Sequence, residues 1–188
     1  AVATTCNNIA LMYDNLEKYD EALEYYQKNL TISLKQLGPD HPSVASIYNN
    51  IAFVYYTQGK HTQALENYEK SLAILLKKFG ANHPAVATIY NNIAASYDAR
   101  GRYDEALEYF EKSLAIRLEK LDKKHPDIAY SFKKLASVYY HKGEFDIARE
   151  HIRKALDIIL SSGKDAPAAE SYLELEAQIN KKMRLFGW

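Results

Sequence analysis

The stretch "IYNNIA" at residues 47–52 places two adjacent carboxamides inside an apolar run, and the same six letters return at residues 89–94. A shorter form, "CNNIA", occupies residues 6–10. Asparagine is a poor helix former because its amide competes with the backbone for hydrogen bonds. The two full copies lie 42 residues apart, so an internal repeat is the first hypothesis to test.

The same period of 42 residues governs other positions along the chain. The dipeptide His-Pro recurs with this period, and so does an alanine at Ala22, Ala64, Ala106 and Ala148. We therefore divide the chain into four units and a tail. The units are 1–42, 43–84, 85–126 and 127–168, and the tail is 169–188.

Within each unit, the sequence predicts two helices joined by a turn. Pro42 stands where the first turn of a helix accepts proline, and apolar residues follow at helical spacing as far as Tyr55. Gly59 is expected to end this helix, and a second one is expected from about His61 to Phe79. No run of period two indicates a strand. A single hairpin cannot bury its own apolar face, so neighbouring hairpins are expected to stack into a continuous core.

The tail is predicted to form a helix that caps the last unit. One face of this helix is apolar and carries Tyr172, Leu175, Ile179, Met183 and Phe186. The opposite face is charged, as a helix covering the end of a stack requires.

The pattern Tyr48, Ile51-Ala52, Tyr55, Gly59, Ala64, Tyr68, Leu72 resembles the tetratricopeptide repeat. The longer unit, with "LGPDHPSVASIYNNIAFVYYTQGK" and "EKSLAI", is similar to the 42-residue repeat of kinesin light chains, and the likeness covers residues 1–168. It implies an all-α tetratricopeptide α-solenoid, a right-handed superhelix of helix-turn-helix repeats with a C-terminal capping helix. It also implies a non-enzymatic protein–protein interaction scaffold that binds an extended peptide in its concave groove.

One departure from the pattern concerns the first hairpin. Glu17 stands where the other units have glycine, so its turn is expected to differ.

Comparison of the four units separates two faces of the first helices. The positions of Tyr48, Ile51, Ala52 and Tyr55 keep their character in nearly every unit, which predicts burial. A second face varies from unit to unit, and the resemblance implies that it lines the groove. The candidate peptide-binding residues on this face are Asn7, Asn8, Asn49, Asn50, Phe53, Tyr56, Asn91, Asn92, Tyr130, Lys133, Lys134 and Tyr140.

The paired amides offer donors and acceptors to the backbone of an extended peptide, and the aromatic residues offer anchoring contacts. By resemblance, Lys133 and Lys134 are expected to receive acidic side chains. Asp14 and Asp98 would repel such a ligand, so it is expected only toward the C-terminal half. The alternative is structural: the asparagines cap, bridge or bond to a neighbouring unit.

Composition argues against several other classes of function. Acidic and basic residues balance at 24 each, so neither nucleic acid nor an anionic membrane is an expected partner. The repeated histidines would lie at least roughly 8–10 Å apart in successive units, whereas metal ligands converge to about 2 Å. No catalytic residue, metal or cofactor is predicted. A single cysteine, Cys6, favours a reducing, cytoplasmic location.

Two alternatives to the peptide-binding scaffold stay open. One is a ligand-sensing repeat module of a larger signalling ATPase or regulator. The other is a self-assembling structural array, in which copies of the chain associate end to end.

Overall fold

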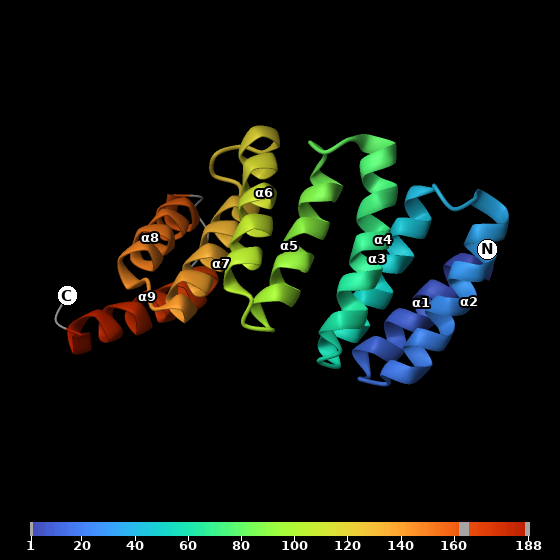
Figure 1. Ribbon diagram of the computed structural model, residues 1–188, viewed down its shortest axis with the longest axis horizontal. Coiled ribbons are helices and arrows are strands. Elements are labelled where there is room, and N and C mark those ends of the chain that lie inside the picture. Colours follow the sequence, from blue (N-terminus) through green and yellow to red (C-terminus); the bar gives the residue numbers. More distant parts are fainter. Residues whose placement is uncertain (1, 162–165, 187–188) are drawn as a thin grey trace. The chain divides into compact units, whose positions relative to one another are not determined.

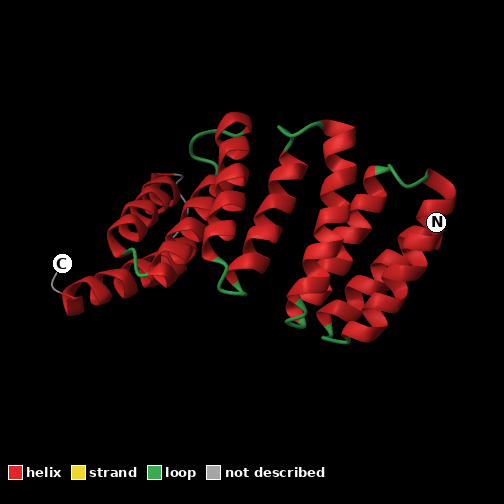
Figure 2. Ribbon diagram, viewed as in Figure 1, coloured by secondary structure: helices red, strands yellow, loops and turns green. Residues whose placement is uncertain are grey.

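The computed structural model describes residues 2–161 and 166–186, and its helices are labelled in Figure 1. Short loops join the helices, and no strand occurs in the described ranges, as Figure 2 shows. The prediction of an all-α fold is confirmed. The helices are α1 (Val2–Asn15), α2 (Tyr19–Leu37), α3 (Pro42–Thr57), α4 (His61–Phe79), α5 (Pro84–Asp98), α6 (Tyr103–Lys120), α7 (Pro126–Lys142), α8 (Phe145–Ser161) and α9 (Ala166–Phe186).

These helices divide into two compact units, and each is described by itself. The first unit ends at Arg100 and holds α1–α5, and the second begins at Gly101 and holds α6–α9. The boundary falls between α5 and α6, inside the predicted third repeat. In the first unit α1 packs on α2 and α3 on α4, and in the second α7 packs on α8. The division of the sequence into four repeats and a tail stays a prediction.

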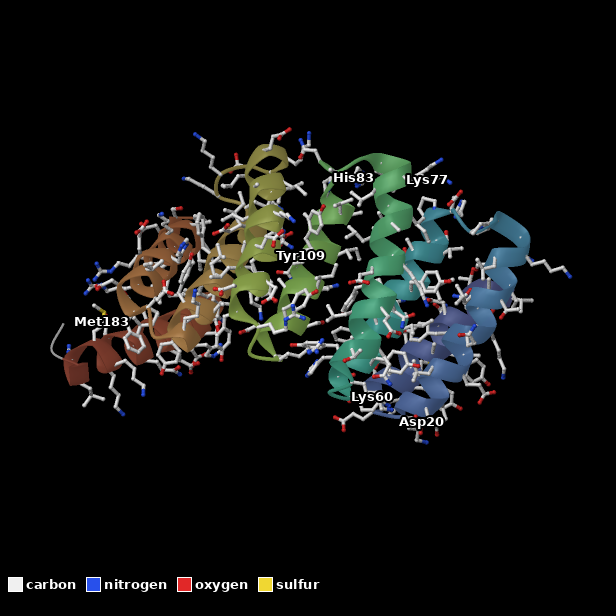
Figure 3. The ribbon with its side chains drawn as sticks, viewed as in Figure 1. Asp20, Lys60, Lys77, His83, Tyr109 and Met183 are labelled. Carbon is white, nitrogen blue, oxygen red and sulfur yellow. The ribbon has the colours of Figure 1, made fainter. Side chains whose placement is uncertain are left out.

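The His-Pro dipeptides mark the starts of α3, α5 and α7. In each case the histidine is the N-cap residue and the proline takes the first helical position, where its missing N–H needs no partner. Figure 3 labels one of them, His83. The imidazole itself completes the cap, which the sequence did not indicate. Nδ1 accepts a backbone N–H at 3.1 Å in His41 from Ser43, at 3.1 Å in His83 from Ala85, and at 3.2 Å in His125 from Asp127.

The turn between α1 and α2 has the same geometry as the other hairpin turns, so the prediction that it would differ is wrong. Glu17 takes a left-handed conformation, with φ at +57°, and Gly59 in the next hairpin has φ at +72°. The two turns share a closing hydrogen bond, from Lys18 N to Tyr13 O at 2.9 Å and from Lys60 N to Tyr55 O at 2.8 Å. Tertiary packing holds the turn even though its residue carries a Cβ.

The core of each hairpin forms around alanine. Ala52 on α3 and Ala64 on α4 are fully buried, which lets the two helices approach closely. Of the other positions predicted to be core, Ile51 is buried, whereas Tyr48 and Tyr55 are only half-buried. The tyrosines depart from the prediction because an amphipathic ring packs its body and keeps its polar end near water.

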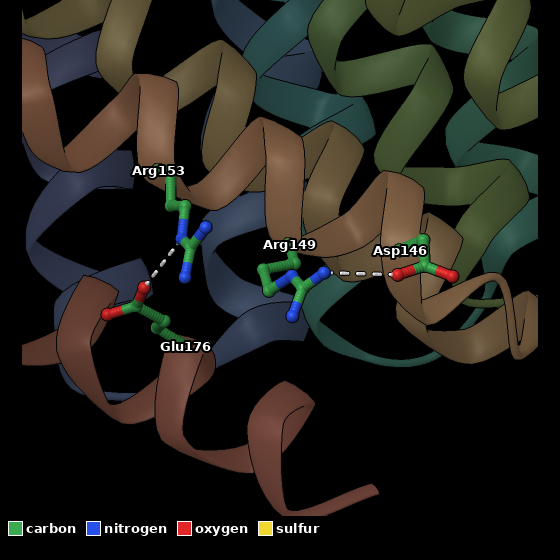
Figure 4. A network of polar contacts seen from close by, with 4 residues as sticks. All are labelled: Asp146, Arg149, Arg153 and Glu176. Carbon is green, nitrogen blue, oxygen red and sulfur yellow. Dashed lines mark hydrogen bonds and ion pairs between the residues drawn. The ribbon is translucent and has the colours of Figure 1, made fainter. Parts of the chain in front are cut away.

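Helix α9 covers the apolar side of α8. Ile179 and Met183 are buried in the cluster that α7 and α8 form, and Met183 is labelled in Figure 3. Arg153 Nε on α8 lies 3.4 Å from Glu176 Oε1 on α9, as Figure 4 shows beside a second ion pair within α8. Such exposed pairs contribute little, so the apolar contacts hold α9 in place. The Phe186 side chain and residues 187–188 of the predicted tail lie outside the described part.

Candidate functional site

Five of the six predicted asparagines form one chain of side-chain hydrogen bonds in the first unit. On α5, Asn91 Nδ2 donates to Asn92 Oδ1 at 3.5 Å, and Asn92 Nδ2 donates to Asn49 Oδ1 on α3 at 2.9 Å. On α3, Asn49 Nδ2 donates to Asn50 Oδ1 at 3.5 Å. Asn50 Nδ2 then donates to Asn7 Oδ1 on α1, also at 3.5 Å. We call these five residues the carboxamide chain.

The period of the sequence explains how the carboxamide chain arises. Each Asn-Asn pair occupies the same position on a first helix, and α3 contacts α5 directly. The second asparagine of one hairpin therefore reaches the first asparagine of the hairpin before it. Part of the hydrogen-bonding capacity of these amides is thus structural, because the bonds join neighbouring hairpins.

The carboxamide chain also keeps capacity for a ligand. A carboxamide has two N–H donors and two acceptor lone pairs, and each bridging amide uses one of each. Asn7, Asn49, Asn50 and Asn92 are half-buried, so their edges reach solvent. Asn91 is only 8% exposed, and its Oδ1 has no partner among the described residues. The sixth asparagine, Asn8, is exposed and lies outside the chain of bonds.

The predicted aromatic residues of the first unit lie on α3. Phe53 follows the asparagine pair by one helical turn, so it shares their face, and it is 46% exposed. Tyr56 is half-buried, and its ring lies 5.3 Å from that of His61, measured between centroids. Of these two predicted residues, Phe53 is therefore the more accessible to a ligand.

In the second unit, the two predicted lysines make different contacts. Lys133 Nζ donates to Ser171 Oγ on α9 at 2.7 Å and lies 4.8 Å from the centroid of the Tyr172 ring. Burial, and then the charge of Lys134, lower the pKa of Lys133. Lys134 Nζ lies 5.3 Å from the ring centroid of Tyr130, which is 39% exposed. Neither lysine forms an ion pair within residues 2–161 and 166–186.

Tyr140, the last of the predicted residues, packs at the end of the α7–α8 hairpin. It is half-buried, and its ring meets that of Phe145 edge-on, with 5.7 Å between centroids. Its contribution to a ligand surface is thus smaller than that of Tyr130.

Sequence reasoning missed a polar hollow between α1, α2 and α3. It has a volume of about 390 Å³, and the buried side chains of Asn29 and Ser33 help to line it. A signal was present in the repeats, because the positions equivalent to Ser33 hold Leu75, Arg117 and Ile159.

The described residues contain no group of three or more His, Cys, Asp or Glu that could hold a metal ion. No helix in the same ranges has the length and apolar character that crossing a membrane requires.

The profile of the tetratricopeptide repeat family matches the chain in three overlapping segments, at residues 1–77, 43–119 and 85–161. The chain therefore belongs to the tetratricopeptide repeat family. Proteins of this family are generally non-enzymatic scaffolds for protein–protein interaction, and the chain has that architecture. No curated protein matches it.

Solved structures similar to this chain place it near kinesin light chain-like repeat proteins. The crystal structure of BtubC (BKLC) from P. vanneervenii is 27% identical, with a TM-score of 0.78, over 87% of this chain and 65% of that one. This chain thus spans less than two thirds of the BtubC chain. A candidate kinesin light chain of Podosopora anserina with nearly identical repeats is 25% identical, with a TM-score of 0.81, over 95% and 85%.

A third structure, the apo form of RapI, has a TM-score of 0.74 at 19% identity, over 85% of this chain and 56% of that one. This likeness concerns the fold alone. The 42-residue repeat of the kinesin light chain type, predicted from the sequence, agrees with these findings.

Proposed function

We propose that the chain binds an extended peptide or partner segment along the face of the first helices that carries the carboxamide chain. The observation that carries this proposal is the half-exposed row of amides on α1, α3 and α5, held in place by their own hydrogen bonds. Side chains that are fixed before binding lose little freedom when a ligand arrives.

The ligand's backbone is the natural partner of such a row. Peptide groups alternate donors and acceptors, and the remaining N–H groups and lone pairs of the carboxamides match both. Phe53, 46% exposed on the same face, adds an apolar contact beside the row. The row therefore favours an extended segment of any sequence, and neighbouring side chains set the preference.

In the second unit, we propose that Lys134 and the exposed ring of Tyr130 receive an acidic or aromatic side chain of a partner. Lys134 is half-buried beside that ring and forms no ion pair in the described part of the chain. Lys133 is less available, because Ser171 on α9 already accepts a hydrogen bond from it. This arrangement shifts the predicted acidic contact from the pair of lysines to Lys134.

The other expectations from the sequence stay predictions. No observation on the described residues favours a sensor module or a self-assembling array over a peptide-binding scaffold. A cytoplasmic location likewise rests on the single cysteine.

The proposal is tested by selecting peptides from a random library displayed on phage and titrating the selected peptides calorimetrically. Replacing Asn49 or Asn92 by alanine should weaken binding by about 1–3 kcal/mol, because partner groups lose their hydrogen bonds. The matched control is Asn67→Ala on α4, where Nδ2 donates to Gln63 O of the same helix at 2.8 Å.

The control should bind within a factor of two of the unchanged chain. Circular dichroism must first show that each variant is folded, because the same amides join hairpins. Equal affinity of folded Asn49→Ala and the unchanged chain for every selected peptide would remove the carboxamide chain from the binding site.

A further inference from the structure

The hollow of about 390 Å³ in the first unit lies where the end of α2 meets the starts of α1 and α3. Its lining carries no charged side chain and combines polar residues with Ala3, Leu37 and Ile47. Two of the lining side chains are at least nine-tenths buried, Ser33 at 3% and Asn29 at 5% exposure. Thr4, Asn7, Ser43 and Ser46 also face the hollow. Volume of this size is typical of sites for small ligands.

The other repeats show that this space is an exception. At the positions that follow Ser33 by 42, 84 and 126 residues, the chain has Leu75, Arg117 and Ile159. All three are buried, at 7%, 9% and 3% exposure. The other three repeats thus bury a large side chain at this position, whereas the first repeat buries a serine. We attribute the hollow to this difference.

Arg117 shows which chemistry the equivalent place in the second unit accepts. Its Nη1 donates to Ser131 Oγ at 2.7 Å and to Asp127 O at 3.2 Å. A planar group with N–H donors therefore fits between the end of a second helix and the start of the next first helix. In the first unit, Asp127 corresponds to Ser43, so no carboxylate balances a cation there.

The free groups of the hollow supply both donors and acceptors. Ser33 Oγ donates to Asn29 Oδ1 at 3.1 Å, which fixes the Asn29 amide. Its Nδ2 makes no hydrogen bond within the described residues, so two N–H donors remain for a ligand. The Ser33 oxygen and the neighbouring hydroxyls can accept in return. An uncharged group that donates and accepts at once satisfies this set.

We propose that the hollow is a binding site for an uncharged carboxamide, the side chain of an asparagine or glutamine in a bound peptide. Asn7 connects it to the carboxamide chain, since Asn7 Oδ1 accepts from Asn50 Nδ2 and the same residue lines the hollow. A peptide lying on the carboxamide chain thus places one side chain into the hollow. In this respect the inference rests on the proposed function and gives it a sequence preference.

The site is tested by titrating the ¹⁵N-labelled chain with the N-methylamides of N-acetyl-glutamine and N-acetyl-asparagine, in which only the side chain is a primary carboxamide, and following the side-chain NH₂ signals of Asn29 by NMR. Leucine and glutamate derivatives of the same form are the ligand controls. At least one of the two carboxamide derivatives should give saturable shifts with an affinity at least tenfold higher than either control. No saturable shift, or equal affinity for the leucine derivative, overturns the proposal.

The matched variant is Ser33→Leu, which copies the residue of the next repeat and so is compatible with the fold. It should abolish the saturable shifts, whereas Ser33→Ala, which keeps the space, should weaken them. Shifts that persist in folded Ser33→Leu overturn the proposal.

These outcomes are separate from those of the proposed function. If Asn49→Ala did not weaken binding of the selected peptides, saturable shifts with the glutamine derivative would still support the site in the hollow. If neither carboxamide derivative gave saturable shifts, weaker peptide binding by Asn49→Ala would still support the carboxamide chain as a binding site.

Discussion

Replacing Glu17 by glycine is expected to stabilise the first hairpin, although it deletes an exposed charged side chain. Glu17 is the one non-glycine residue with positive φ in the described ranges, at +57°. A side chain in the left-handed region costs about 1–2 kcal/mol. Glycine removes this cost but loses roughly 0.5–1 kcal/mol through its greater freedom in the unfolded chain. The net gain in the free energy of unfolding is therefore between zero and about 1.5 kcal/mol, with a midpoint of about 0.75 kcal/mol.

The measurement is urea denaturation followed by circular dichroism. Two matched variants separate the backbone effect from the loss of charge. Glu17→Ala deletes the carboxylate but keeps a Cβ, so it should not reproduce the gain. Gly59→Glu introduces a side chain into the equivalent turn, where φ is +72°, and should destabilise the fold by a similar amount. If Glu17→Gly were no more stable than Glu17→Ala, strain in this turn would be excluded as the reason.

Three further predictions concern the core and its buried polar groups. Burial, and then a neighbouring lysine, lower the pKa of His151 in the folded chain. The unfolded chain therefore binds a proton at this histidine more readily than the folded chain does. The stability contributed by the neutral imidazole should be full above about pH 6.5 and should fall as the pH drops below it. Urea midpoints between pH 5 and pH 8 measure this slope, and His151→Tyr should flatten it. Arg117→Leu, which copies Leu75, should change the free energy of unfolding by less than about 1 kcal/mol, whereas Arg117→Ala should lower it by about 2–4 kcal/mol. Equal losses for the two variants in urea denaturation would contradict this difference. Ala52→Leu should cost about 1–3 kcal/mol through overpacking. The control Ala73→Leu, at an exposed position, should be nearly neutral, and urea denaturation of both variants measures the difference.

The repeat period predicted most of the fold, because hairpin stacking imposes the same requirements at each copy. The proline after each histidine and the alanine at each close approach are such requirements. The period could not predict the backbone conformation at a position whose residue departs from the repeat. Glu17 breaks the pattern in sequence and keeps it in backbone geometry, since the packing of the two helices outweighs a local cost of about 1–2 kcal/mol.

The candidate site was predictable only in part. The asparagine pairs were identified from their repetition, but hydrogen bonds between side chains of different hairpins depend on how the helices pack. The same holds for Lys133, whose contact with Ser171 comes from α9. The hollow beside Ser33 illustrates a different limit: an unfilled volume appears in the sequence only as the absence of a large residue, and that absence is visible once the four copies are compared.

The uniform direction of the carboxamide chain has one more consequence. If a single amide rotated by 180°, two oxygens would face each other on one side and two NH₂ groups on the other. The five amides therefore have two self-consistent settings, the observed one and its complete reversal. Because Asn91 Oδ1 is buried, a ligand meets the row at its other terminus, Asn7, where a partner that accepts from Nδ2 favours the observed setting.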